Sequence, residues 1–190
     1  ELTFDVTLTS GTYEIPEEEC ALAPPNIAVV SGDYDHIEDI IAAMGLEYTL
    51  FEGSFYSEEY LNFLRDPAAM AEFDIIFFNC GISDGWINSQ GGTIGSNIKS
   101  YVEGGGSIYS SDWAFFFFEK AFPDAADFYG EDSRVDSARV GAMGNIIAEV
   151  LDANMQLVLG SNTADLYYDL GSWAIAESVD SSTTEVLIRG

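Results

Sequence analysis

Three short loops carry most of the side chains in this sequence that could do chemistry. They comprise residues 31–36, 79–84 and 110–113, and each lies at the end of an apolar run that predicts a β-strand. Because ligands of open parallel sheets bind outside the carboxyl ends of the strands, we expect the three loops to converge on one site. Its predicted ligand-binding residues are Asp33, Asp35, Asn79, Asp84, Ser110 and Asp112.

The carboxylates of these loops have two alternative interpretations. Hard cations prefer oxygen ligands, so Asp33, Asp35 and Asp84 are candidate ligands for a calcium ion. Alternatively, each aspartate caps the helix that follows its strand by accepting hydrogen bonds from free backbone N–H groups. The expectation for cofactors is therefore none, or calcium.

The same loops contain two side chains that could act as nucleophiles, Ser111 and Cys80. Either would need a helper, and the candidates are Asp112 and His36, the only histidine of the chain. The run around Ser111 lacks the flanking glycines of a G-x-S-x-G elbow. The sequence therefore predicts no catalytic residue, and a divergent hydrolase built on these four side chains is an alternative.

The chain has two cysteines, Cys20 and Cys80. One disulfide between them would tie the N-terminal segment to the sheet. Two free, buried thiols are an equally good interpretation. The sequence leaves this choice open.

The elements that must position these loops alternate between strand and helix from residue 26 onward. This order predicts an α/β fold: a doubly wound, flavodoxin-like parallel sheet with helices on both faces. We expect strand one to neighbour strand three, and strand three to neighbour strand four. The predicted strands are 27–30, 48–51, 73–79 and 107–110, and the predicted helices are 37–44, 58–64, 94–102 and 113–122.

Further segments complete the predicted architecture. An alternating stretch at 2–8 predicts a strand, followed by an acidic linker, so we divide the chain into residues 1–25 and an α/β domain at 26–190. Residues 145–150 could be a strand or the start of a helix. The last part of the chain should form an antiparallel extension beside the parallel sheet, with strands at 164–170, 173–177 and 185–188.

The run from Phe73 to Gly81, with a helix that ends at Gly104 and a strand at 107–110, resembles the class I glutamine amidotransferase-like scaffold. The similarity covers residues 26–122 and is closest to the trehalose-utilisation-type or related non-amidotransferase branches. It implies a nucleophile elbow near Ser111 or Asp112, where true amidotransferases have cysteine, and a histidine base in the C-terminal third. This sequence has no cysteine at those positions and no histidine in its C-terminal third. The resemblance therefore implies a scaffold that has lost its catalytic residues.

The charge of the chain narrows the classes of partner. Asp and Glu number 33 against 6 Lys and Arg, which gives a net charge of -27. Nucleic acids and anionic membrane surfaces need a basic footprint, so the composition argues against both. No apolar run approaches the roughly 20 residues that span a membrane. The charge, together with the start at Glu1, suggests a secreted or cell-surface protein in a saline or calcium-containing environment that screens self-repulsion.

These observations together predict a non-catalytic extracellular or surface domain. It would be used for binding or for self-assembly into an oligomer or filament, with residues 1–15 exchanged as a strand between copies. The hydrolase described above is the first alternative. The second is a calcium-stabilised carbohydrate-binding module that would use Tyr34, Trp86 and Trp113 beside the acidic loops.

Overall fold

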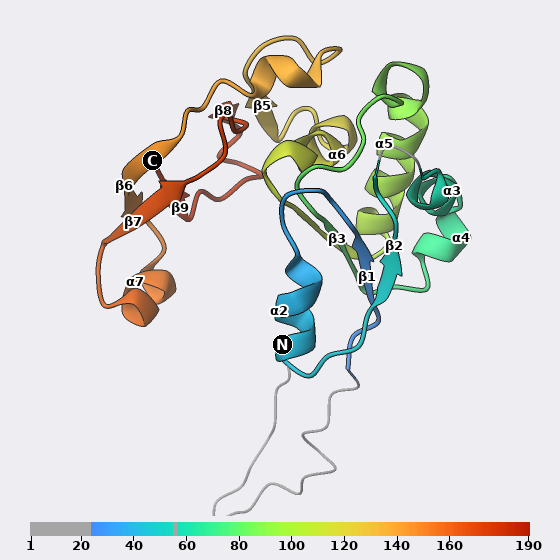
Figure 1. Ribbon diagram of the computed structural model, residues 1–190, viewed down its shortest axis with the longest axis horizontal. Coiled ribbons are helices and arrows are strands. Elements are labelled where there is room, and N and C mark those ends of the chain that lie inside the picture. The colour runs from blue at the N-terminus through green and yellow to red at the C-terminus, as the bar shows by residue number, and fades with distance from the viewer. Residues whose placement is uncertain (1–23, 55–56) are drawn as a thin grey trace, which may run out of the picture.

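The computed structural model describes residues 24–54 and 57–190. Its centre is a four-stranded parallel sheet in the order β2-β1-β3-β4, as Figure 1 shows, so the predicted neighbours of the third strand are confirmed. The predicted strand at 2–8 and Cys20 lie outside the described residues. The strands of the sheet are β1 (Ile27–Val30), β2 (Thr49–Phe51), β3 (Ile75–Phe78) and β4 (Ser107–Ser110).

Helices cover both faces of this sheet, as predicted. On one face, Ile41 of α2 (Ile37–Ala43) packs against Ile27 and Val29 of β1. Ala28 and Val30 belong to the larger core on the opposite face. Successive strand residues point to opposite faces, so the unbroken apolar run of β1 serves both cores. The helices of the larger core are α3 (Glu59–Arg65), α4 (Pro67–Met70), α5 (Ile87–Glu103) and α6 (Phe115–Ala121).

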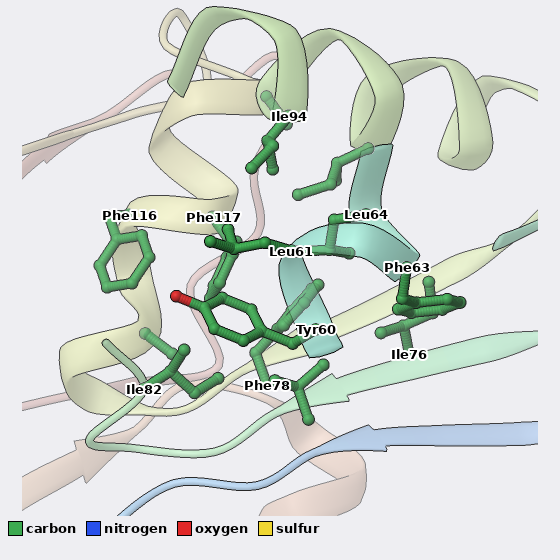
Figure 2. Packing of buried hydrophobic residues seen from close by; sticks show 14 of the residues in the cluster. Tyr60, Leu61, Phe63, Leu64, Ile76, Phe78, Ile82, Ile94, Phe116 and Phe117 are labelled. Carbon is green, nitrogen blue, oxygen red and sulfur yellow. The ribbon is translucent and has the colours of Figure 1, made fainter. Parts of the chain in front are cut away.

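Aromatic side chains fill the larger core, which Figure 2 shows from close by. Phe117 of α6 is fully buried and stacks on Phe78 of β3 with ring centroids 4.1 Å apart. Trp86, directly before α5, lies with its ring centroid 5.5 Å from that of Phe117. The hydroxyl of buried Tyr60 donates a hydrogen bond to the backbone carbonyl of Ser83 at 2.7 Å. This packing fixes α6, and with it the loop that leads into α6 from β4.

The C-terminal half forms two small antiparallel sheets (Figure 1). The predicted antiparallel extension is confirmed, and it forms sheets of its own that are not hydrogen-bonded to β4. The ambiguous segment at 145–150 is a strand. The sheets are β5 (Ala126–Phe128) with β8 (Ala176–Val179), and β7 (Thr163–Tyr168), β6 (Gly144–Val150) and β9 (Ile188–Arg189), with α7 (Ala153–Leu159) between β6 and β7.

Several predicted elements begin later or earlier than expected, and the predicted strand at 185–188 begins only at Ile188. The predicted strand at 173–177 starts at Ala176, because Trp173 instead stacks on Tyr168 with ring centroids 4.2 Å apart. The predicted helix at 94–102 instead begins at Ile87. It includes several glycines, a residue type that disfavours helices. The predicted helix at 113–122 begins at Phe115, after a 3-10 turn at Asp112–Ala114. Within the described residues, no helix combines the length and apolarity needed to cross a bilayer.

Candidate functional site

The first and second of the three predicted loops are joined at the carboxyl edge of the sheet. The backbone N–H of Cys80 donates a hydrogen bond to the carboxylate of Asp35. The carbonyl of Cys80 accepts a hydrogen bond from the backbone N–H of Tyr34 at 3.2 Å. A Cβ atom on Gly32 would lie only 2.8 Å from the Cys80 carbonyl carbon, so the loop after β1 packs against the loop after β3 with no space for a side chain.

Asn79 connects the end of β3 to α2 and to the segment just before α2. Its side chain is fully buried, and its amide nitrogen donates to the carbonyl of Asp35 at 3.1 Å and to Glu38 at 2.7 Å. The other carboxylate oxygen of Glu38 lies 3.1 Å from Nδ1 of His36. This hydrogen bond is the main cause that raises the pKa of His36, whose side chain is 61% exposed. The only histidine is therefore paired with Glu38 rather than with a nucleophile.

Asp112 occupies the sharp turn between β4 and α6. Its φ of 36° is the only positive φ of a non-glycine residue in the described part of the chain. Such a backbone conformation is tolerated best by Asn, Asp and Gly. This is the position of the elbow expected near Ser111 or Asp112. Ser111 itself makes backbone hydrogen bonds only, to Phe78 at 3.0 Å and from Ala114 at 2.8 Å.

The Asp112 carboxyl group joins the third loop to the second and to the segment around Ala174. Its Oδ1 accepts a hydrogen bond from the backbone N–H of Ala174 at 2.8 Å, and its Oδ2 lies 3.6 Å from Sγ of Cys80. Burial raises the pKa of Asp112, and the Asp35 carboxylate nearby adds to the rise. Folding therefore favours the protonated form of Asp112 relative to the unfolded chain.

We expect Asp112→Asn to stabilise the protein at pH 7 and to have little effect at pH 3. A group whose pKa is raised on folding contributes its full stability below its unfolded pKa and loses it as the pH rises through its folded pKa. Asparagine stays neutral and tolerates the positive φ. Urea unfolding at both pH values measures the difference. The control Asp112→Ala should lower stability at pH 3 by about 1–2 kcal/mol, because alanine is strained at this φ. A pH-independent effect of Asp112→Asn would contradict the assignment.

Cys80 is a buried free thiol, 2% exposed. Burial is the largest cause that raises its pKa to about 12, so the thiol stays protonated at neutral pH. Only a thiolate is a good nucleophile, and the structure thus gives Cys80 no catalytic activation. Of the two predictions for the cysteines, the free thiol is the one seen at Cys80, whereas Cys20 lies outside the described residues.

A Cys20→Ser variant isolates Cys80 for a simple test. We expect its thiol to resist Ellman's reagent at pH 8 in the folded state and to react at once in denaturing urea, because burial prevents both access and ionisation. Absorbance at 412 nm follows the reaction. Rapid modification of the folded protein would show that Cys80 is an accessible, ionisable group.

Arg139 is a site residue that the sequence analysis missed. Its guanidinium forms a 2.7 Å salt bridge with Asp84 and lies 4.0 Å above the ring of Trp113. Tyr34 packs edge-on against the same indole, with ring centroids 5.0 Å apart. One long side chain from the segment before β6 thus links the loops after β3 and β4. No local pattern marks it, although it is one of only 6 Lys and Arg in the chain.

The structure does not bring the three predicted calcium ligands together. Asp33 is exposed, Asp35 accepts from Cys80, and Asp84 pairs with Arg139. The capping interpretation also fails for α2, which has no side-chain cap. Among the described residues, the acidic group whose ligand atoms all lie within 4.8 Å of one another is elsewhere, at Glu119, Asp127 and Asp132.

The three aromatic residues of the carbohydrate hypothesis have different surroundings. Trp86 is only 5% exposed and donates its ring N–H to the carbonyl of Ser83, so the expectation that it faces a ligand is wrong. Tyr34 is 51% exposed, and Trp113 is half-buried beneath Arg139. Two of the three therefore lie at the carboxyl edge.

Some polar side chains near this edge have unused hydrogen-bonding capacity. Within the described residues, three buried side-chain polar atoms have no partner: Oδ1 of Asn79, Oγ of Ser110 and Nε of Arg139. Asn79 follows β3, Ser110 ends β4, and Arg139 contacts the loops after both strands. Ser110 and Asp112 also line a cavity of about 340 Å³, whose other walls are Ile108, Phe115, Phe118, Phe128 and Ala174.

The arrangement as a whole is polar, and its one contact between a candidate nucleophile and a candidate helper in the described residues joins the protonated thiol of Cys80 to Asp112. The parallel α/β sheet agrees with the predicted fold class, and the resemblance to class I glutamine amidotransferase-like proteins stays a prediction. No model of a known protein family, no curated protein and no solved structure matches this chain.

Proposed function

We propose that this chain is a non-catalytic binding domain that takes an uncharged, hydroxyl-rich ligand at the carboxyl edge of its sheet. The supporting observation is that the three buried polar atoms without a partner, on Asn79, Ser110 and Arg139, belong to segments at or next to this edge. A buried polar atom without a hydrogen bond costs free energy, so it favours any molecule that completes it. These atoms include acceptors and a donor, and a hydroxyl group can match both.

The charges at this edge support an uncharged ligand. Asp35 and Asp84 carry negative charge in the loops after β1 and β3, and the guanidinium of Arg139 already forms a salt bridge with Asp84. The net charge of -27 repels anions further. The exposed ring of Tyr34, supported by Trp113, offers an apolar face of the kind that packs against a sugar ring.

The geometry supports binding over hydrolysis. His36 is paired with Glu38, and the thiol of Cys80 is protonated at neutral pH. Ser111 has no base among its hydrogen-bond partners in the described chain. A group that cannot be ionised or deprotonated does not start nucleophilic catalysis.

A chemical-shift titration of the ¹⁵N-labelled protein with a panel of neutral mono- and disaccharides tests this function. We expect saturable shifts in residues 31–36, 79–84 and 110–113, weakened by Tyr34→Ala and by Ser110→Ala. Tyr167→Ala is the matched control, because Tyr167 is 64% exposed on β7. No saturable shift with any sugar, or shifts confined to β6 and β7, would contradict the proposal. Release of hydrolysis products in the same tube would favour the hydrolase.

A second candidate function is self-assembly by strand addition, and the open edge of β4 favours it. The N–H of Ser107 donates to the carbonyl of Asp74, just before β3, at 2.9 Å, and the N–H of Ser111 donates to the carbonyl of Phe78 in β3 at 3.0 Å. Because backbone groups alternate along a strand, those of Ile108 and Ser110 face away from β3. Both residues line the cavity of about 340 Å³, so a partner strand would meet an apolar wall there and backbone groups that no described strand pairs with.

In this second candidate, the incoming strand comes from residues 1–15 of another copy, which include the alternating stretch at 2–8. Assembly would take place outside the cell or at its surface, where salt screens the charge. We expect oligomers of the full chain in calcium-containing buffer by light scattering, and monomers after deletion of residues 1–15 or with Ile108→Pro. Proline removes the outward N–H, whereas the control Ile108→Val keeps it. A full chain that is monomeric in every buffer would rule out this candidate.

A further inference from the structure

The cavity of about 340 Å³ lies where β4, α6 and β5 meet, and it includes part of the carboxyl edge. Ile108 and Ser110 are two residues apart on β4, so their side chains point to the same face of the strand, and both line the cavity. Ser110 ends the strand, and Asp112 follows it in the turn. The cavity therefore joins the strand end to the apolar core beside it.

Three phenylalanines form an apolar wall of this cavity. Phe115 and Phe118 come from α6, and Phe128 comes from the end of β5. The rings of Phe115 and Phe128 have centroids 4.5 Å apart and planes tilted by 36°. Aromatic rings attract one another in offset and edge-to-face arrangements at such distances. The wall therefore favours a further aromatic ring over a polar group.

The polar groups of the cavity belong to Ser110 and Asp112. The hydroxyl oxygen of Ser110 is buried and has no hydrogen-bond partner. Oδ1 of Asp112 already accepts a hydrogen bond from Ala174, which also lines the cavity, at 2.8 Å. Burial raises the pKa of Asp112, so the surroundings of its carboxyl group disfavour negative charge. A group that enters here should be neutral and mostly apolar.

The size of the cavity is sufficient for one aromatic ring. An apolar protein cavity of about 150 Å³ already binds benzene, and this cavity is more than twice as large. We propose that the ligand of the carboxyl edge is an aryl glycoside, whose aromatic ring occupies this cavity beside the hydroxyl of Ser110. The inference rests on the proposed function, because the sugar itself stays at the carboxyl edge with Tyr34.

Calorimetric titration with matched pairs of glycosides tests the inference. Each pair consists of the phenyl and the methyl glycoside of one sugar, and the sugars are glucose, galactose and mannose. We expect the phenyl member of the pair that binds to bind at least about tenfold more tightly, because burial of its ring removes apolar surface from water. If both members bind equally, the proposed function stands and this inference alone is overturned. If no glycoside binds, both fail.

Two variants of the cavity wall should remove this preference for the phenyl glycoside. Phe118→Ala takes away part of the aromatic wall, and Ala174→Leu fills part of the space. The matched control is Tyr109→Ala, because Tyr109 points to the opposite face of β4, where its ring centroid lies 5.5 Å from that of Phe77. The control should keep the full preference. Equal loss in the control and the wall variants, or no loss in either wall variant, would contradict the proposal.

The methyl signals of the isoleucines show where the aromatic ring binds. In the unmodified chain, the δ1-methyl signal of Ile108 should shift with the phenyl glycoside and stay in place with the methyl glycoside, because only the aromatic ring carries a ring current. Ile146 and Ile188 line a separate apolar cavity of about 760 Å³ between the two small sheets. A phenyl-specific shift at these two residues in place of Ile108 would overturn the assignment.

Discussion

Replacing Phe117 with alanine should lower the free energy of unfolding by about 3–5 kcal/mol. Phe117 is fully buried, stacks on Phe78 with centroids 4.1 Å apart, and also contacts Trp86 and Phe116. Removing the ring loses its burial and leaves a cavity between α6 and the sheet. Urea unfolding followed by tryptophan fluorescence measures the change.

Phe118→Ala on the same helix is the control. Phe118 is partly exposed and its nearest aromatic partner, Phe122, lies at a centroid distance of 5.7 Å. Its loss should cost less than half as much as that of Phe117, because less surface leaves water on folding. Equal costs at the two positions would mean that α6 does not present Phe117 to the sheet as described.

Gly95→Ala should destabilise the protein by about 1–3 kcal/mol, although alanine is normally the better helix residue. A Cβ atom at position 95 of α5 would lie 2.8 Å from the carbonyl carbon of Lys120 and closer still to its oxygen. Both obstacles are backbone of α6, so they cannot move aside without separating the helices. Thermal and urea unfolding give the size of the effect.

Gly92→Ala provides the matched control with the opposite sign. It lies in the same helix, is exposed, and a Cβ atom there would meet nothing within 4 Å. The substitution should stabilise the protein by about 0.5–1 kcal/mol, because alanine loses less backbone entropy than glycine on folding. If Gly95→Ala were also stabilising, the close contact of α5 with α6 would be wrong.

Local sequence patterns predict some residues of the candidate site and miss others. Asp35, Asn79 and Asp112 were predicted from their place after strands, and the structure joins the loops that carry them. Arg139 was not predicted, because it comes from a segment far along the chain that no pattern connects to the sheet. The calcium ligands predicted at Asp33, Asp35 and Asp84 failed to meet for a related reason: adjacency of loops does not fix where side chains point.

Local patterns are enough to predict the parallel sheet and the loops at its carboxyl edge. Continuous apolar runs at 27–30 and 75–78, ended by polar residues, are a local signal of strands that are buried on both faces. Only the packed chain shows which titratable side chains are buried and which are hydrogen-bonded. The pKa of Cys80, the partner of His36 and the burial of Glu119 depend on neighbours from distant segments. Burial and pairing are properties of the packed chain, so no spacing of residues along the sequence could reveal them.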